Sequence, residues 1–412
     1  MGKEILVFAH WDHFHQPTLV GQLRSTPLRN KEHFSFSYSN SWLVGGYAQK
    51  IDPYLELYTG EQHSSEDRNF RIFLDSAPDR WGRLLMDRRE TILARRENRQ
   101  RKKLYEIDYL LGVHDHYRMG GLRYKINEDG RFLNDEHQLT APPLSSLPEL
   151  EQAVHKIESD QNAMDDDYLR WLSMLFSPGS SLGGARPKSS VVDGEGNLWI
   201  AKFPSRFDNY DVGAFEMLCY LMAIECKIVM QECSIKKFHS RHHTFLTKRF
   251  DRIGTKRVHF SSAMTQLGYY DGDEGGSYLE IVEFLVAQGA QTKTDLEQLF
   301  RRIVFSIAVT NCDDHLRNHG FLLTSKGWIL SPAYDINPVA IAEGLSLNIS
   351  EYSNLLDFEL AREVGEYFRL SSAQASLIIK EIKAVVSLWQ NKAKALGISR
   401  GDCEALASAF RF

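Results

Sequence analysis

The sequence predicts an α+β fold that consists of a small mixed unit, then a strand-rich lobe, then a helical lobe. Short runs that alternate apolar and polar residues dominate the first half, whereas apolar residues after Tyr278 mostly recur at helical spacing. The length of 412 residues also exceeds what one hydrophobic core usually holds. We therefore expect two or three packed units along this chain.

The first predicted domain covers residues 1–126 and mixes strands with helix. The alternating run from Phe34 to Tyr38 indicates a strand, and the pattern from Pro78 to Glu97 indicates a helix. Residues 127–150 are polar and rich in turn formers, among them Asp129-Gly130 and Pro142-Pro143. This segment is therefore predicted to be a linker.

The strand-rich lobe is predicted to cover residues 151–251. It begins with apolar residues at helical spacing between Tyr168 and Phe176, and a long Gly-rich loop follows. The runs Lys188 to Val192 and Leu198 to Phe203 flank an Asp-Gly-Glu-Gly-Asn turn, which indicates a hairpin. Residues 252–412 form the predicted helical lobe, where Ser372 to Leu396 carries one apolar stripe that ends before a glycine.

Composition narrows the class of protein and its compartment. A net charge of −5 argues against a protein whose main task is to coat nucleic acid. The sequence has no run of about 18 apolar residues and no basic leader, so we expect neither a membrane span nor a signal peptide. Its five cysteines are odd in number and lack a CxxC pair, which favours the reducing cytoplasm.

The loop from Ser177 to Ser190 concentrates glycines, hydroxyl groups and two cations, which suits a phosphate cradle. It resembles a Walker A motif in the spacing of Gly179 and Gly184. However, Ala185 stands where that motif needs lysine, and a strand follows instead of a helix, so a P-loop NTPase is disfavoured. An ordinary surface loop between two elements is the alternative.

Lys202 lies in an otherwise apolar strand, and Glu216 lies among apolar residues of the next helical segment. A lysine is costly to bury unless it meets an anion. Kinases pair a strand lysine with a helix glutamate to hold the α and β phosphates of the nucleotide. The alternative is a lysine on a half-exposed strand and a glutamate on a solvated helix face.

The segment Asn311 to Gly320 carries the most specific pattern. Asp313 and Asn318 have the spacing of a kinase catalytic loop, where the aspartate orients the acceptor hydroxyl and the asparagine completes magnesium coordination. A predicted hairpin then returns the chain to Asp335, which adds a second carboxylate for a hard cation. The alternative is that Asp313 or Asp314 merely caps a helix or turn.

These motifs together resemble the HipA-like kinases, toxins of bacterial toxin–antitoxin pairs. The likeness rests on Ser180 to Lys188, on the run Asp313 to Asn318 and on the pair Tyr334-Asp335. Two segments of the first domain, Phe73 to Trp81 and Leu110 to Asp115, are similar to the small N-terminal domain of full-length members. The resemblance implies a two-lobed protein-kinase-like fold with an N-terminal mixed α/β accessory domain.

The resemblance also implies the cofactors ATP and Mg²⁺ and the roles of individual residues. Asp313 is then the catalytic aspartate, Asn318 and Asp335 hold the metal, and Lys202 contacts the phosphates. The resemblance also assigns the nucleotide site its other residues. The Gly-rich loop supplies Gly183, Gly184, Ala185 and Lys188, and Glu216 is the partner of Lys202. Lys248 and Phe250 lie at the adenine hinge, and His315 braces the catalytic loop. Ser181 is implied as an autophosphorylation site, with Ser180 as the alternative.

By the same resemblance the substrate is a serine or threonine of a protein, with an aminoacyl-tRNA synthetase as a candidate, and a HipB-like helix-turn-helix antitoxin is the partner. Asp87 to Lys103 holds eight basic and three acidic residues, which suits either a solvated face or contact with DNA beside that antitoxin. Arg186, Pro187 and the segment Ser261 to Met264 depart from the family pattern, which leaves substrate identity open. Two rivals are a small-molecule or lipid kinase of the same fold and a nucleotide-binding regulator without catalysis.

Overall fold

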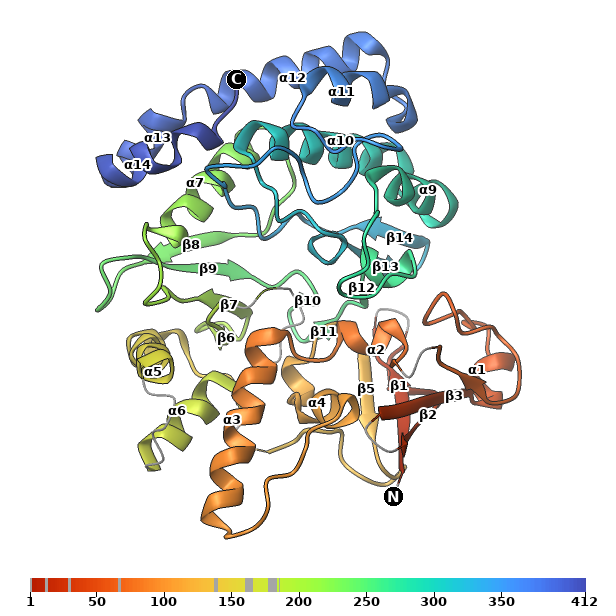
Figure 1. Ribbon diagram of the computed structural model, residues 1–412. Helices are drawn as coiled ribbons and strands as arrows, with labels where there is room; N and C mark the ends of the chain where they lie inside the picture. The colour runs from red at the N-terminus through yellow and green to blue at the C-terminus, as the bar shows by residue number, and fades with distance from the viewer. Residues whose placement is uncertain are drawn as a thin grey trace. The chain divides into compact units, whose positions relative to one another are not determined.

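The computed structural model describes residues 2–11, 14–28, 31–65, 68–136, 140–159, 166–176, 184 and 186–412. Contacts between Cα atoms divide the chain into two compact units (Figure 1). The first unit comprises Met1–Ala201 and Asp251–Ser261, and the second comprises Lys202–Phe250 and Ser262–Phe412. The functional domain boundaries expected from the sequence stay a prediction.

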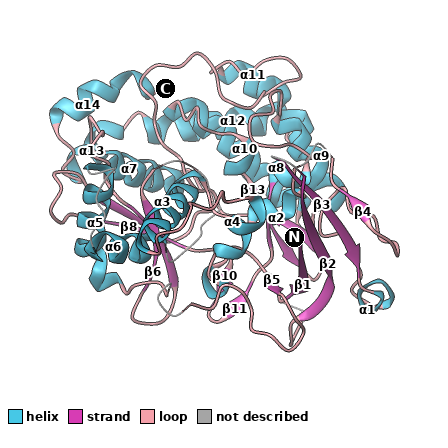
Figure 2. Cartoon of the chain, turned by 60° about the horizontal axis from the view of Figure 1, so that its bottom comes forward, coloured by secondary structure: helices cyan, strands magenta, loops and turns pink. Residues whose placement is uncertain are grey.

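The first unit contains an antiparallel five-stranded sheet, and Figure 2 shows its strands side by side. Its strand order is β4-β3-β2-β1-β5. The strands are β1 Lys3–Ala9, β2 Thr18–Leu28, β3 Lys31–Tyr38, β4 Gln62–His63 and β5 Leu122–Lys125. Alternate residues of β1 are fully buried, because one face of a half-buried strand packs on the core. The strand expected at Phe34 to Tyr38 is confirmed as part of β3.

The helices of the first unit lie in the chain either between strands β3 and β5 of this sheet or after β5. They are α1 Asn40–Val44, α2 Arg71–Asp75, α3 Arg80–Arg96, α4 Glu106–Gly112, η1 Asp115–Tyr117, η3 Leu144–Ser146, α5 Leu147–Ser159 and α6 Asp166–Phe176. The helix expected at Pro78 to Glu97 is confirmed as α3, whose N-cap Asp79 accepts a hydrogen bond from the Gly82 amide. The segment expected as a linker, 127–150, contains η3 and the buried start of α5.

The hairpin expected after the Gly-rich loop is also present. It consists of β6 Lys188–Val192 and β7 Leu198–Lys202, which are neighbours in one sheet. The Asp193 carboxylate accepts hydrogen bonds from the amides of Glu195 and Asn197, and Gly196 takes a positive φ of 84°, so the turn residues account for the reversal. Two short strands, β10 Arg252–Ile253 and β11 Lys256–Arg257, pair with each other.

The second unit is mainly helical. Its helices are α7 Val212–Glu225, α8 Ala263–Gln266, α9 Tyr278–Gln288, α10 Thr292–Val309, η4 Leu316–Asn318, α11 Phe358–Glu363, η5 Val364–Phe368, α12 Ser372–Val386, α13 Trp389–Ala395, α14 Arg400–Leu406 and η6 Ala407–Ala409. Its strands are β8 Cys233–Lys236, β9 Thr244–Lys248, β13 Gly320–Thr324 and β14 Gly327–Leu330, and β12 Phe260–Ser262 crosses the boundary between the units in sequence. The helical character predicted for the chain after Tyr278 is therefore confirmed.

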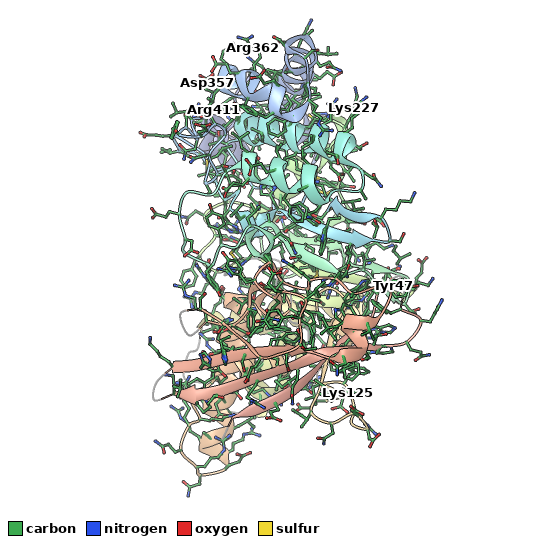
Figure 3. The ribbon with its side chains drawn as sticks, turned by 90° about the vertical axis from the view of Figure 1, so that its right-hand side faces the viewer. Tyr47, Lys125, Lys227, Asp357, Arg362 and Arg411 are labelled. Carbon is green, nitrogen blue, oxygen red and sulfur yellow. The ribbon has the colours of Figure 1, made fainter. Side chains whose placement is uncertain are left out.

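Helix α10 lies at the centre of this unit and packs against α9 and α12. Nearly every residue of α10 from Leu296 to Val309 is buried, so this helix forms the hydrophobic core that supports the segment after it. By contrast, α11 lies at the surface, where Arg362 pairs with Glu359 at 2.6 Å (Figure 3). None of the helices in the described part of the chain is both long and apolar enough to cross a membrane.

The single apolar stripe expected from Ser372 to Leu396 is wrong in one respect. The helix stops at Val386, and α13 begins at Trp389, so Ser387 and Leu388 form a break between two helices. Leu377, expected in the buried stripe, is 56% exposed. After the break, α13 begins with Trp389, whose ring stacks on that of Phe410 near the end of the chain, with ring centroids 4.1 Å apart.

Candidate functional site

Lys202 is the centre of a largely buried group of charges in the second unit. Its ammonium lies 2.5 Å from Glu216 on α7 and 2.7 Å from Asp335. Burial by itself lowers the pKa of Lys202, but the adjacent carboxylates of Asp335 and Glu216 outweigh that cost and raise the pKa above its ordinary value. The lysine is therefore a fixed positive charge, held by two carboxylates from distant parts of the chain.

The segment after α10 presents Asp313 to solvent. The helix ends at Val309, and Thr310 takes a left-handed conformation with φ of 50° that turns the chain away from the helix axis. The Asp313 side chain is 71% exposed, and its carboxylate lies 3.5 Å from the imidazole of His315. The Asn318 amide donates to the Asp313 carbonyl at 2.6 Å. The five-residue spacing seen in the sequence thus brings Asp313 and Asn318 together.

The neighbouring Asp314 is buried and holds this segment in place. Its carboxylate accepts hydrogen bonds from the Tyr278 hydroxyl and from the Ser346 amide, each at 2.6 Å. Burial raises the pKa of Asp314 to about 6. Of the two adjacent aspartates, Asp314 therefore has the structural role that the sequence left open, and Asp313 is accessible. The spacing of residues gave no sign that Tyr278 would be the partner.

Asp335 follows the hairpin of β13 and β14, as the sequence predicts. It has a positive φ of 57°, an unusual conformation for a residue other than glycine and one that is often found at functional sites. Asn337 donates to the Asp335 carboxylate at 3.3 Å, and the Asn337 amide donates to the Asn311 side chain at 3.2 Å. Asn337 was not singled out in the sequence, although it lies in the segment Ser331 to Asn337.

The residues around Asp335 suit a hard cation. The side-chain oxygens of Asn318 and Asn337 are buried and have no hydrogen-bond partner among the described residues. Asn318, Asn311 and Asp314 also line a cavity of about 10 Å³, roughly the space of one water. Carboxylate and amide oxygens are the ligands that Mg²⁺ prefers, so Asn318 and Asp335 fit this metal.

The expected adenine hinge lies at the end of β9. The Lys248 amide donates to the Glu232 carbonyl at 2.9 Å, so an adenine base needs other backbone groups of this segment. The buried Phe250 ring packs against Tyr334, with centroids 5.5 Å apart, and the Tyr334 hydroxyl donates to the Arg317 carbonyl at 2.7 Å. Contact of Lys248 and Phe250 with adenine stays a prediction.

Residues 177–183 and 185 of the Gly-rich loop lie outside the described residues, and the expected site residues Ser180, Ser181, Gly183 and Ala185 are among them. Gly184 and Lys188 are described and belong to the first unit. The Lys188 ammonium lies 3.0 Å from the Asp79 carboxylate, and both side chains are buried. The Trp81 indole donates to the Lys188 carbonyl at 3.1 Å. The expected contact of Lys188 with phosphates therefore stays a prediction, and Asp79 is a partner that the sequence did not reveal.

Comparison with known proteins places these features in a family. Residues 180–389, just over half of the chain, match the model of the HipA-like C-terminal domain. A curated relative from Sinorhizobium fredii strain NGR234, named "Putative kinase Y4dM", is 26% identical over 269 residues, which cover 52% of this chain and 64% of that protein. The match thus spans less than two thirds of the relative's length.

A solved structure extends the likeness in fold to nearly the whole chain. HipA from the Shewanella oneidensis MR-1 toxin–antitoxin complex with HipB and operator DNA matches with a TM-score of 0.64 at 15% identity. The match covers 98% of this chain and 94% of that one. The predicted α+β fold class, kinase-like with an N-terminal mixed domain, is thereby confirmed.

Proposed function

The chain belongs to the family of the HipA-like C-terminal domain, and we propose that it is an ATP- and Mg²⁺-dependent serine/threonine protein kinase that acts as a growth-inhibiting toxin. The observation that carries the proposal is the buried triad of Lys202, Glu216 and Asp335, in the same unit as the exposed Asp313 and its partner Asn318. An ion pair with only a structural role would not explain why the side-chain oxygens of Asn318 and Asn337 have no hydrogen-bond partner among the described residues. A phosphoryl-transfer site explains them, because it needs oxygen ligands for its metal.

In the proposed enzyme, Lys202, Glu216 and Asp335 bind the phosphates of the nucleotide and its metal ion. Glu216 holds the Lys202 ammonium where it would meet the phosphates of ATP, and Asp335, which contacts the same ammonium, would be a ligand of the metal. Mg²⁺ held by Asp335 and Asn318 would neutralise the charge of the phosphates. Because the transition state of phosphoryl transfer is loose, positioning and charge neutralisation supply most of the catalysis.

In the proposed reaction, Asp313 acts on the hydroxyl group that accepts the phosphoryl group. Its exposed carboxylate orients the acceptor hydroxyl and takes its proton as the new O–P bond forms and the bond to the leaving ADP oxygen breaks. His315, within 3.5 Å, braces that carboxylate. An exposed catalytic carboxylate is accessible to a side chain of a whole protein, which favours a protein acceptor over a small molecule.

We predict that Asp313→Asn lowers the turnover of labelled ATP into lysate protein by about 10²–10⁴-fold, the usual contribution of a general base. ATP affinity should stay within a few-fold, because Asp313 acts on the acceptor and not on the phosphates. Asp129→Asn, an exposed aspartate in a turn of the first unit, is the matched control. Wild-type turnover in folded Asp313→Asn protein would show that the carboxylate has another role.

The same reaction tests whether the enzyme modifies itself. We propose Ser181 as the autophosphorylation site, with Ser180 as the alternative, because the family resemblance covers this loop. A phosphate adds about −1.5 to −2 charges near Lys188 and the loop amides, which disfavours binding of ATP. Peptide mapping after incubation with ATP and magnesium, with Asp313→Asn as the blank, decides between the serines; phosphate on neither would refute the proposal.

The partner and the substrate are proposed from family likeness. The HipA of Shewanella oneidensis forms a complex with HipB and operator DNA, and we propose a HipB-like helix-turn-helix antitoxin for this chain, with DNA contacted through that complex. An aminoacyl-tRNA synthetase is the candidate substrate. Identification of the labelled product in lysate tests it, since a labelled lipid or metabolite would favour the rival small-molecule kinase.

A further inference from the structure

The first unit contains a cavity of about 530 Å³ that the proposed catalysis does not use. This volume lies in the range of sites for small organic ligands. All its lining residues belong to the first unit, whereas the catalytic triad belongs to the second. The lining consists of two histidines, two other aromatic residues, two arginines, two aspartates and two uncharged polar residues: His114, Asp115, His116, Tyr117, Arg123, Arg131, Phe132, Asn134, Asp135 and Thr140.

One wall of this cavity is built from flat rings. The His114 ring lies tilted against Tyr117, and His116 meets Tyr117 edge-on, both with centroids 4.9 Å apart. The His114 Nδ1 accepts a hydrogen bond from the His116 amide at 3.2 Å. Burial, then the charges of Arg257 and Arg252, lower the pKa of His116 to about 4 and keep it neutral. Such a wall offers ring faces and N–H donors to a planar ligand.

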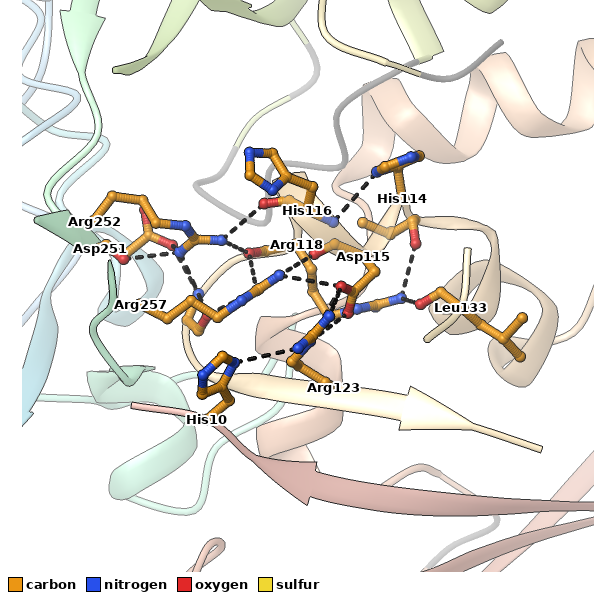
Figure 4. A network of polar contacts seen from close by, with 12 residues as sticks. His10, His114, Asp115, His116, Arg118, Arg123, Leu133, Asp251, Arg252 and Arg257 are labelled. Carbon is orange, nitrogen blue, oxygen red and sulfur yellow. Dashed lines mark hydrogen bonds and ion pairs between the residues drawn. The ribbon is translucent and has the colours of Figure 1, made fainter. Parts of the chain in front are cut away.

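The cavity lining also contains the arginine Arg123. Arg123 pairs with Asp115 at 2.5 Å and lies 3.6 Å over the Phe132 ring. Figure 4 shows that this pair continues into a network with Arg252, which pairs with Asp251 at 2.5 Å, and with Arg257.

Among the described residues of this network, guanidinium groups outnumber carboxylates. Including the buried Arg118, which donates to backbone carbonyls, these are four guanidinium groups and the carboxylates of Asp115 and Asp251. Burial, and after it repulsion by Arg252, lowers the pKa of Arg257 well below its ordinary value. Buried cations cost free energy unless an anion compensates them. An anion in the cavity beside Arg123 would supply that compensation.

A further cation lies in the lining. The Arg131 side chain is 81% exposed and lies 3.5 Å from Asp135 in an i,i+4 pair, a loose contact that leaves the guanidinium able to turn toward a ligand. We propose that this cavity binds a purine mononucleotide, with its base against the wall of His114 and Tyr117 and its phosphate beside Arg123 and Arg131. The site goes beyond the proposed phosphoryl transfer and would let nucleotide levels act on the first unit.

The experiment uses calorimetric titration of the full chain with AMP. The background variant is Lys202→Met, which disables the proposed ATP site, with Asp335→Asn as a second background if the first does not fold. AMP should bind either background at one site per chain. Arg131→Glu should raise the Kd of that site about tenfold or more, since it removes a charged hydrogen-bond donor. Arg400→Glu removes another exposed i,i+4 pair in the second unit and should change nothing.

The outcomes separate this site from the proposed function. Ribose 5-phosphate should bind at least tenfold more weakly than AMP; equal affinity would overturn the part assigned to the base. Absence of AMP binding in both backgrounds, or binding that Arg131→Glu leaves unchanged, would overturn the site itself. Phosphoryl transfer should stay within twofold in Arg131→Glu, so a failure of the kinase proposal would show in the transfer assay and not in these titrations.

Discussion

At the scale of single residues, one buried ion pair defines the start of β6. Asp79 caps α3 through the Gly82 amide with one carboxylate oxygen and meets the Lys188 ammonium with the other. Gly184 lies against this pair, since a Cβ at that position would be 3.3 Å from the ammonium. The last residue of the Gly-rich loop motif is therefore anchored to the N-terminal part of the chain.

We predict that Asp79→Asn or Lys188→Met each lowers the free energy of unfolding by about 3–5 kcal/mol, because either change leaves a buried charge without its partner. The double variant should lose clearly less than the sum of the two. Urea unfolding of the four proteins measures this coupling. Glu359→Gln and Arg362→Met, which break a surface pair, should each cost less than about 1 kcal/mol.

Additive losses at positions 79 and 188 would contradict an anchoring pair. The same variants also test the phosphate contact that the family resemblance implies for Lys188. If Lys188→Met kept its stability but raised the KM for ATP, the lysine would act on the phosphates, as the sequence predicts.

At the scale of elements, helix α10 has a buried carboxyl group, that of Asp295, in its first turn. Asp295 lies in the first turn of the helix, where a negative charge is favoured by the helix dipole, yet only 5% of it is exposed. Burial raises its pKa to about 6, a larger effect than the lowering by the Leu330 amide and Arg302. The folded protein therefore retains the Asp295 proton up to about pH 6, and the ionised form predominates only above that pH.

The pH dependence follows from this raised pKa. Between the ordinary value of 3.8 and about 6, the unfolded chain has already lost the proton that the folded protein retains. The contribution of Asp295 to stability is thus present below about pH 4 and is lost as the pH rises to about 6.

We predict that Asp295→Asn gains stability relative to the wild type as the pH rises from 4.5 to 7. Between these two pH values the gain is about 2 kcal/mol, because a shift of one pKa unit corresponds to about 1.4 kcal/mol and part of the full effect of about 3 kcal/mol is already present at pH 4.5. Urea unfolding of both proteins at several pH values measures it. Parallel stability curves for the two proteins would show that Asp295 is protonated normally. Asp314 titrates in the same direction but is present in both proteins, so the difference isolates Asp295.

At the scale of the whole molecule, the sequence predicts the order of the parts and the members of the triad, because these residues occupy recognisable positions in strands, helices and a hairpin. It does not predict partners that are distant in sequence, such as Asp79 for Lys188 or Asp115 for Arg257. No local pattern encodes such pairs, since only the packed fold brings the side chains together.

The basic segment from Asp87 to Lys103 shows the same limit. The sequence counts its charges but not their partners. In the structure Arg99 pairs with Glu90 and Glu97, and Arg101 pairs with Asp87. Part of the positive charge that suggested contact with DNA is therefore neutralised within the segment, and contact with DNA stays a proposal.

Growth arrest is the property that tests the molecule as a whole. An enzyme modifies many substrate molecules per copy, whereas a silent regulator must match its target in number. We therefore predict that low-level expression of the wild type without an antitoxin stops growth and that Asp313→Asn at the same level does not. Wild-type protein with a co-expressed HipB-like antitoxin should permit growth. Equal arrest by both proteins would favour the regulator, and harmless expression of a demonstrably active enzyme would remove the toxin assignment while leaving the kinase in place.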